Sequence, residues 1–254
     1  MTIAKGSIKG LVFCGGRGVR LRPLTYYFQK VMIPVGSKQK PLLEYVIKLL
    51  KYHEIHEIVL MVNYKADQIV NYFDDGSRYG IKITYVRDKP RLSGTCFALL
   101  NAFNSGFINE KDTLLIYYGD ILSNIDLSDL LIKHTKSKAT VSVALSKSFP
   151  IPVGVAEVGR DLRILNFVEK PVLEKPVSIG ILALDGKVLK YAEELGKGRT
   201  KLDLMADLMP YLIKLGEPVY AYLTEDFWYD VGTTEKYEKL NNNFIDKKLC
   251  YLMD

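Results

Sequence analysis

The most constraining feature of this chain is an apolar run that ends in a loop of glycines and arginines. Residues 11–14 are apolar, and the loop follows them directly. Glycines let backbone N–H groups turn inward and approach a ligand closely, and arginines add permanently charged, fork-shaped donors. A strand that ends in such a loop is typical of a phosphate-binding site. The loop holds Gly15, Gly16, Gly18, Arg17, Arg20 and Arg22.

Length and composition predict one α/β domain spanning residues 1–254. The chain has 254 residues, 48% of them apolar, which is enough for a large core. It has no apolar run of about 18 residues and no signal-peptide core, so we expect no membrane segment. Cys14, Cys96 and Cys250 are widely spaced. This spacing predicts free thiols in a reducing compartment, the cytoplasm, and argues against zinc or disulfides.

The net charge of +6 fits anionic small-molecule substrates. A basic protein can bind nucleic acid, but here the lysines are scattered and no dense block of Lys and Arg with interleaved aromatic residues appears. We therefore expect neither nucleic acid nor a membrane as a partner. The sequence permits a homo-oligomer without specifying one.

Apolar runs alternate with helix-period stretches through the first half of the chain. This pattern predicts a doubly wound, mostly parallel sheet covered on both faces, with Rossmann-like connections. Ligands of such sheets bind beyond the carboxyl ends of the strands, so the glycine loop and Gly119-Asp120 would face one cleft. The expected strands are 8–14, 58–62, 81–86, 114–118 and 139–145, and the expected helices begin near Pro41, Ala66, Thr95 and Asp126.

The pattern changes near Pro150. Two alternating stretches, 152–158 and 162–168, flank Gly159-Arg160-Asp161, which predicts a hairpin. We expect residues 1–150 to form a nucleotide-binding half and 151–243 a β-rich, sugar-phosphate-binding half, followed by a tail over 244–254 that docks on the core or on a partner. The second half would contribute strands at 178–184 and 219–223 and helices at 187–195, 203–215 and 233–243.

The glycine loop matches neither common nucleotide motif. The G-x-G-x-x-G pattern lacks its third glycine, and no lysine follows directly as G-x-x-x-x-G-K-[ST] requires. A plain strand-to-helix turn does not need three arginines within six residues.

Four further positions are ambiguous when taken singly. Lys30 fits a surface lysine beside an apolar run, and Glu169-Lys170 fits a surface ion pair. Asp120, just past a buried strand, is placed either to hold Mg²⁺ or to cap a turn. Asp230 is a second candidate metal ligand or an ordinary loop residue.

Taken together and in order, these motifs resemble the sugar-1-phosphate nucleotidyltransferases, in a short form without a C-terminal β-helix. The resemblance spans about residues 8–243. It rests on the loop from Gly15 to Thr25, Lys30, Gly94-Thr95, Gly119-Asp120, Glu169-Lys170-Pro171 and the segment from Trp228 to Gly232.

The resemblance implies that a sugar 1-phosphate oxygen attacks the α-phosphorus of an NTP, giving NDP-sugar and pyrophosphate, with Mg²⁺ as cofactor. It implies catalytic roles for Arg20, Lys30, Asp120 and Lys170, and metal binding by Asp120 and Asp230. The implied nucleotide-binding residues are Leu11, Gly15, Gly16, Arg17, Gly18, Gly94, Thr95 and Gly119. The implied sugar-phosphate-binding residues are Gly154, Glu169, Lys170, Ser178 and Gly180.

Several positions depart from the family pattern and leave the substrates open. Val19, Val31 and Cys96 replace the usual Thr, Pro and Ala, and Ser178 stands where Asn is usual. Residues 87–93, expected near the base, match neither familiar pattern, so UTP, dTTP and GTP all remain. A non-catalytic homologue that binds nucleotide sugars is the main alternative. An NAD(P)-dependent oxidoreductase is disfavoured by the missing glycine and by the arginines of the loop.

Overall fold

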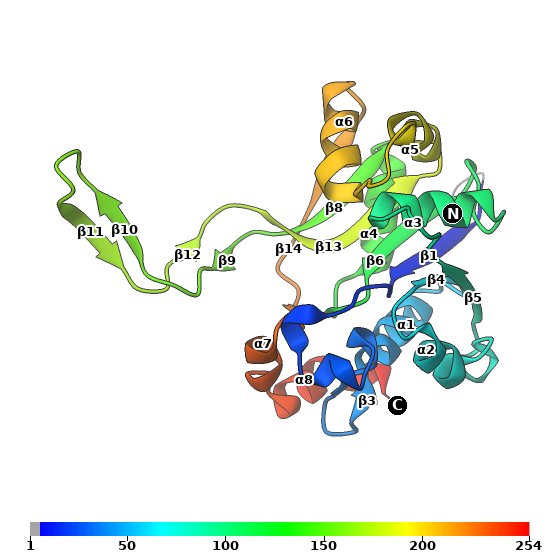
Figure 1. Ribbon diagram of the computed structural model, residues 1–254, viewed down its shortest axis with the longest axis horizontal. Helices are drawn as coiled ribbons and strands as arrows, with labels where there is room; N and C mark the ends of the chain where they lie inside the picture. The colour runs from blue at the N-terminus through cyan, green and yellow to red at the C-terminus, as the bar shows by residue number, and fades with distance from the viewer. Residues whose placement is uncertain (1–5, 254) are drawn as a thin grey trace.

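A seven-stranded sheet in the order β14-β8-β13-β6-β1-β4-β5 forms the centre of the molecule. The computed structural model describes residues 6–253. The sheet is parallel except for β13, which runs antiparallel to both of its neighbours. The expected doubly wound, mostly parallel sheet is confirmed (Figure 1). Its strands are β1 (Ile8–Phe13), β4 (Glu57–Val62), β5 (Lys82–Arg87), β6 (Thr113–Tyr118), β8 (Val141–Ser146), β13 (Val177–Asp185) and β14 (Val219–Thr224).

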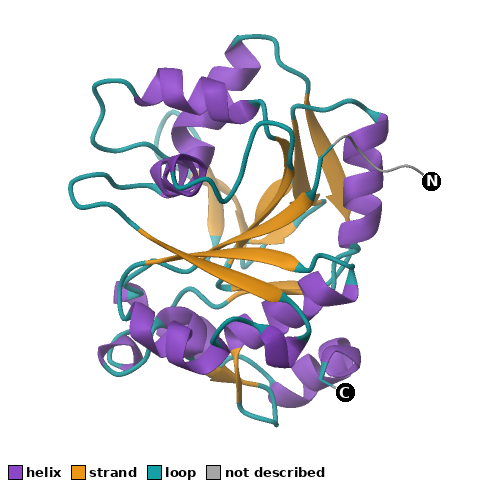
Figure 2. Ribbon diagram, turned by 90° about the vertical axis from the view of Figure 1, so that its right-hand side faces the viewer, coloured by secondary structure: helices purple, strands orange, loops and turns teal. Residues whose placement is uncertain are grey.

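Helices cover both faces of the sheet (Figure 2). Side chains alternate along each strand, so Leu11 of β1 packs with one helical layer and Val12 with the other, and both are fully buried. One layer contains α3 (Thr95–Asn104), α5 (Val188–Gly196) and α6 (Met209–Lys214), preceded by a π-helical turn (Leu204–Leu208). The other contains α1 (Leu42–Tyr52), α2 (Ala66–Phe73), α4 (Leu127–Lys136) and α8 (Asn242–Leu249).

The helix boundaries follow local signals in the sequence. Helix α1 begins directly after Pro41, and its predicted apolar face is buried. Asp126 caps α4, because its side chain accepts a hydrogen bond from the Asp129 amide at 2.9 Å. The last predicted helix is divided into α7 (Thr234–Glu238) and α8, and the side chain of Asn241 caps α8.

The end of the chain docks on its own core. Ile245, Leu249 and Leu252 are buried, and the Tyr251 ring packs edge-on against Tyr52 of α1 at 4.9 Å between centroids. Of the two docking sites expected for this tail, it uses the core of the same chain.

Residues 149–173 form an arm that projects from the sheet (Figure 1). The predicted hairpin is present as β10 (Val155–Val158) and β11 (Ile164–Val168), and the short pair β9 (Phe149–Pro150) and β12 (Val172–Leu173) lies at its base. Every residue of β10 and β11 is exposed. At the base of the arm, the Phe149 ring stacks on Trp228 with centroids 6.0 Å apart.

Two further pairs of short strands flank the sheet: β2 (Pro34–Val35) with β3 (Lys40–Pro41), and β7 (Ile121–Ser123) with β15 (Trp228–Asp230). Short 3₁₀ turns cover Val19–Leu21, Leu24–Tyr26, Lys30–Met32, Ser77–Tyr79 and Cys250–Leu252. Among the described residues, no helix is both long enough and apolar enough to span a bilayer.

Candidate active site

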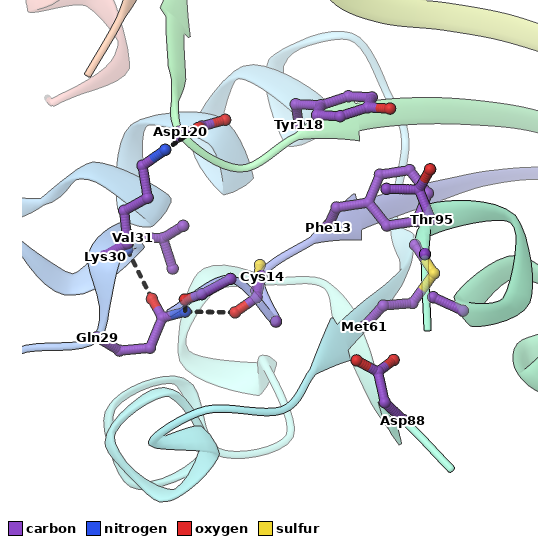
Figure 3. A pocket seen from close by; sticks show the side chains of 14 residues that line it. Phe13, Cys14, Gln29, Lys30, Val31, Met61, Asp88, Thr95, Tyr118 and Asp120 are labelled. Atoms are coloured by element: carbon purple, nitrogen blue, oxygen red, sulfur yellow. Dashed lines mark hydrogen bonds and ion pairs between the residues drawn. The ribbon is translucent and has the colours of Figure 1, made fainter. Parts of the chain in front are cut away.

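A cavity of about 320 Å³ opens at the carboxyl ends of β1 and β6. Six of the predicted site residues line it: Gly15, Gly16, Lys30, Gly94, Thr95 and Asp120. The strand ends approach each other closely because Gly119 has no side chain. A Cβ at Gly119 would lie 2.8 Å from the Phe13 carbonyl oxygen. The expected meeting of the glycine loop with Asp120 in one cleft is therefore observed (Figure 3).

Thr25 contacts the glycine loop at Gly18 and fixes its conformation there. Gly18 adopts a left-handed conformation with φ +57°, and a Cβ there would lie 2.7 Å from the Thr25 methyl group. The Thr25 hydroxyl donates to the Gly18 carbonyl at 2.8 Å. A Cβ at Gly16 would meet no atom within 4 Å. The loop therefore leaves open space beside its backbone, as a phosphate-binding loop requires.

The arginines of the loop lie on the surface. Arg17 and Arg20 are exposed, and within residues 6–253 neither guanidinium makes a hydrogen bond or ion pair. Arg22 lies over the Tyr26 ring, 5.1 Å from its centroid. Unpaired guanidinium groups beside a glycine loop are available to an anionic ligand.

Gln29 is a site residue that sequence reasoning missed. Its side chain is fully buried, and its amide donates to the carbonyl oxygens of Cys14 and Gly16 while accepting from the Val31 amide. It thereby connects the glycine loop to the segment that carries Lys30. The signal that could have found it is weak: a polar residue close to the apolar run from Val31 to Ile33.

Lys30 and Asp120 form a direct ion pair in the cavity. Their side chains are only 13% and 23% exposed, so water screens the pair incompletely. Cys14 lies next to this pair. Burial, with a smaller contribution from the Asp120 charge, raises the pKa of its thiol. The cysteine is therefore a neutral group in the cavity wall.

Strand pairing brings the second predicted metal ligand beside Asp120. In the β7–β15 ladder Asp230 is opposite Ile121, and the Val231 amide donates to the Asp120 carbonyl at 3.0 Å. The Asp230 carboxylate pairs with Lys236 at 2.7 Å. Thr234 donates to the backbone carbonyls of Arg20 and Arg22 at 3.3 and 3.2 Å, which holds this segment against the glycine loop.

These residues fit a hard divalent cation. Two carboxylates, Asp120 in the turn between β6 and β7 and Asp230 at the end of β15, match what Mg²⁺ takes from a protein when phosphate oxygens and water complete its shell. A cluster of three or more acidic, His or Cys side chains, which could form a cage made only of protein ligands, is absent from the described part of the chain. Lysine ammonium groups neutralise both carboxylates in this structure.

Gly94 and Thr95 line the cavity, and both also have structural partners. Gly94 has φ +104°, and a Cβ there would collide with the Leu202 carbonyl oxygen. The Thr95 hydroxyl donates to the Asp203 carboxylate and accepts from the Leu204 amide, each at 2.8 Å. The need for glycine and threonine at the start of α3 is thus explained by packing against residues 202–204.

The structure places the remaining predicted residues outside the cavity wall. Leu11 is fully buried in the core, so its side chain is a packing residue in this structure. Gly180, with φ +77°, lies against Tyr118, since a Cβ there would be 3.2 Å from that side chain's Cβ. Ser178, two residues earlier in β13, is exposed.

Three predicted sugar-phosphate residues lie on the arm, away from the cavity. Gly154 lies against Glu169, because a Cβ at Gly154 would be 2.8 Å from a Glu169 carboxylate oxygen. Lys170 is 3.9 Å from Glu169, and both side chains are well exposed. The arm therefore keeps these three residues together, and none of them lines the cavity that contains Asp120.

Comparison with known proteins identifies chains that are similar to this one in sequence. The family model described as Nucleotidyl transferase matches residues 9–247. A UTP–glucose-1-phosphate uridylyltransferase of Synechocystis sp. is 31% identical over 95% of this chain and 64% of its own length. A mannose-1-phosphate guanylyltransferase of Mycobacterium tuberculosis is 29% identical over 92% of this chain and 64% of its own length. This chain thus spans less than two thirds of these curated relatives.

A solved structure shares the fold. The crystal structure of a putative glucose-1-phosphate thymidylyltransferase from Bacillus anthracis superimposes with a TM-score of 0.75 at 23% identity. The match covers 94% of this chain and 95% of that chain. At this identity the match supports the fold of the sheet and helices alone.

Proposed function

This chain belongs to the nucleotidyl transferase family, and from that premise we propose that it transfers a nucleotidyl group from an NTP to a sugar 1-phosphate, releasing pyrophosphate. One observation carries the proposal: a single cavity gathers an open glycine loop, a lysine and a strand-end carboxylate, with unpaired guanidinium groups beside it. Two polyanions must meet in this reaction, and positioned positive charge lowers the cost of bringing them together.

The nucleotide would bind along the glycine loop. Backbone amides of Gly15, Gly16 and Gly18 would hold its phosphates, with Gly119 keeping the strand ends close. Arg17 and Arg20 would reach the triphosphate from the surface side. Lys30 would neutralise charge around the reacting phosphates once its ion pair with Asp120 is broken. No general base is needed, because the attacking phosphate oxygen is already an anion.

Asp120 and Asp230 would hold Mg²⁺, together with phosphate oxygens of the substrates. A bound divalent cation offsets the charge on the α-phosphate and the incoming phosphate. When the two carboxylates bind the cation, the ion pairs of Asp120 with Lys30 and of Asp230 with Lys236 would break. Both ammonium groups would then be free to contact phosphate oxygens.

The sugar phosphate would be held by residues of the second half. Lys170 would pair with its phosphate, Glu169 would accept hydrogen bonds from sugar hydroxyls, and Gly154 would let the backbone approach. Gly180, which lies beside Tyr118, would form the wall nearest the cavity, together with Ser178 two residues earlier in β13. The arm would have to move toward the cavity for these contacts to form.

A substrate matrix tests the proposal. Four NTPs are combined with glucose, mannose and heptose 1-phosphates in the presence of Mg²⁺, and pyrophosphate release is measured. At least one pair is expected to turn over, and EDTA is expected to abolish turnover. Tight binding of nucleotide sugars without turnover for any pair would identify a non-catalytic homologue instead.

The protein would act in the cytoplasm, with NTP and sugar 1-phosphate as its partners and with neither nucleic acid nor membrane. The scattered charge supports the absence of nucleic acid. Exposed apolar side chains on the arm, among them Leu162 at 83%, support a homo-oligomer. Sedimentation velocity over a range of protein concentrations would test the oligomer.

A further inference from the structure

The cavity has a second end whose chemistry differs from that of Lys30 and Asp120. On the opposite side, Asp88 stands beside the apolar side chain of Met61 (Figure 3), and Ala98 lines the same cavity. Asp88 follows the carboxyl end of β5, and its amide donates to the Val62 carbonyl at 3.2 Å. Its Oδ2 lies close to the glycine loop, 3.2 Å from where a Cβ at Gly15 would be. This end offers apolar surface and one carboxylate, beside the loop proposed to hold phosphates.

The Asp88 carboxylate has acceptor capacity left over. Oδ2 accepts one hydrogen bond from Asn63 Nδ2 at 3.0 Å. Across residues 6–253 no donor bonds to Oδ1, and neither oxygen has a lysine or arginine within ion-pair distance. An ionised carboxylate offers about four lone-pair sites and no donor. A ligand that fills the cavity would therefore meet an acceptor-only group.

Among the common bases, guanine alone presents two adjacent donors on one edge, N1–H and the N2 amino group. Uracil and thymine present a single N3–H between two carbonyl oxygens. Adenine and cytosine place an acceptor nitrogen beside their amino group. A carboxylate facing those edges would have one oxygen opposed to a lone pair, which leaves a buried polar atom unpaired.

We propose that the transferred nucleotide is a guanylyl group, and that Asp88 selects it by accepting hydrogen bonds from N1–H and the N2 amino group of GTP. This inference rests on the proposed nucleotidyl transfer and assigns its base. Met61 and Ala98 contact the base faces, and Asn63 holds the carboxylate toward the base edge.

Unmodified protein gives the first test, with GTP, ITP, UTP and dTTP as competing donors. ITP retains N1–H but lacks the N2 amino group, so its kcat/KM is expected to be about 10- to 100-fold below that of GTP, the cost of one hydrogen bond to a charged acceptor. UTP and dTTP are expected to be about 100-fold or more below GTP. Equal use of GTP and ITP, or a preference for UTP or dTTP, would overturn the assignment of Asp88.

The variant Asp88→Asn gives the second test. An amide presents one acceptor and one donor, which matches the N1–H and C2 carbonyl of XTP and the N3–H and O4 of UTP. The variant is expected to lose at least about 10-fold in kcat/KM with GTP and to gain with XTP. The matched change Asp75→Asn, at an exposed turn after α2, is expected to leave the donor preference unchanged.

The outcomes separate the two proposals. Absence of turnover with every NTP and sugar 1-phosphate would contradict the transferase itself. Turnover with another base preferred would leave the transferase standing and refute the selection by Asp88. If Asp88→Asn does not fold, as judged by its circular dichroism spectrum, the GTP and ITP comparison on unmodified protein still decides the matter.

Discussion

Asp120 stands at the meeting point of the cavity's charges, since it pairs with Lys30 and is joined through its backbone to the segment that carries Asp230. The variant Asp120→Asn keeps the shape of the side chain and removes its charge. We expect kcat to fall about 100-fold or more, because one of the two proposed metal ligands would be lost. The free energy of unfolding should fall by about 1 to 3 kcal/mol, because the Lys30 ammonium, which is only 13% exposed, loses its charged partner. Pyrophosphate release and urea denaturation measure the two effects.

Gln29 is expected to act by positioning, since it bridges the glycine loop and the Lys30 segment. Gln29→Leu would leave the Cys14 carbonyl and the Val31 amide unpaired in the interior, lowering the free energy of unfolding by about 2 kcal/mol. Because the glycine loop would no longer be held in a fixed position relative to Lys30, kcat/KM should fall about 10-fold or more. Gln29→Glu keeps the acceptor for Val31 and loses the donors. A Glu variant as active and stable as the unmodified protein would contradict this role.

The three thiols should differ in reactivity. Burial raises the pKa of Cys14, and burial likewise raises the pKa of Cys96 to about 12. A raised thiol pKa favours the neutral form, so at pH 8 the nucleophilic thiolate is scarce at both positions. Cys250 is exposed. Iodoacetamide at pH 8 should therefore label Cys250 alone in the folded protein. Mass spectrometry of the peptides measures the labelling, and modification of Cys14 or Cys96 at the rate of Cys250 would contradict the prediction.

At the scale of elements, the arm separates residues that the proposed function requires together. If Glu169 and Lys170 hold the sugar phosphate, the arm must approach the cavity when substrates bind. Trypsin cleavage at Arg160 and Arg163, in the exposed turn between β10 and β11, should then slow several-fold when NTP, Mg²⁺ and sugar 1-phosphate are all present. Gel electrophoresis over time measures the rate.

The variant Lys170→Ala serves as the control for this movement. It should lose the protection given by the sugar 1-phosphate and raise the KM for that substrate. It should keep the cleavage rate of the ligand-free protein, because the Lys170 side chain is 68% exposed and, within residues 6–253, its one ion pair is with Glu169. Unchanged kinetics together with full protection would exclude Lys170 from the sugar-phosphate site.

The sequence predicted most elements, because their signals are local. The start of α1 after Pro41 and the cap of α4 at Asp126 both depend on a few neighbouring residues. The antiparallel direction of β13 and the projection of the arm could not be read this way. An apolar run looks the same in either strand direction, and the position of a hairpin depends on what its base packs against, here Trp228.

The candidate site was predictable only where residue type and spacing were informative. Glycines, arginines and strand-end carboxylates identify themselves by type, so the wall formed by Gly15, Gly16 and Asp120 was expected. Gln29 is an ordinary polar residue in the sequence, and Asp88 lies within residues 87–93, which the resemblance placed near the base without singling out Asp88. They enter the site because the fold carries their segments to β1, and three-dimensional proximity of this kind leaves no local signature.

At the scale of the molecule, the C-terminal segment joins parts that are distant along the chain. Thr234 contacts the glycine loop, Tyr237 donates to the Pro34 carbonyl at 2.8 Å, and Asp246 accepts from the Ser37 amide at 3.2 Å. These contacts lie on either side of the segment that carries Lys30. The position of the Lys30 segment in the site therefore depends on contacts between the N-terminal and C-terminal parts of the described chain.

The positive charge of the whole molecule should make substrate capture depend on salt. With a net charge of +6 and unpaired Arg17 and Arg20 beside the cavity, attraction to NTP acts through water and is screened by ions. Raising KCl from about 0.05 to about 0.5 M should raise the KM for NTP several-fold and change kcat less. Arg20→Gln should flatten this dependence, whereas Lys248→Gln, at an exposed position of α8, should not. Equal slopes for both variants would assign the attraction to net charge instead of to the loop.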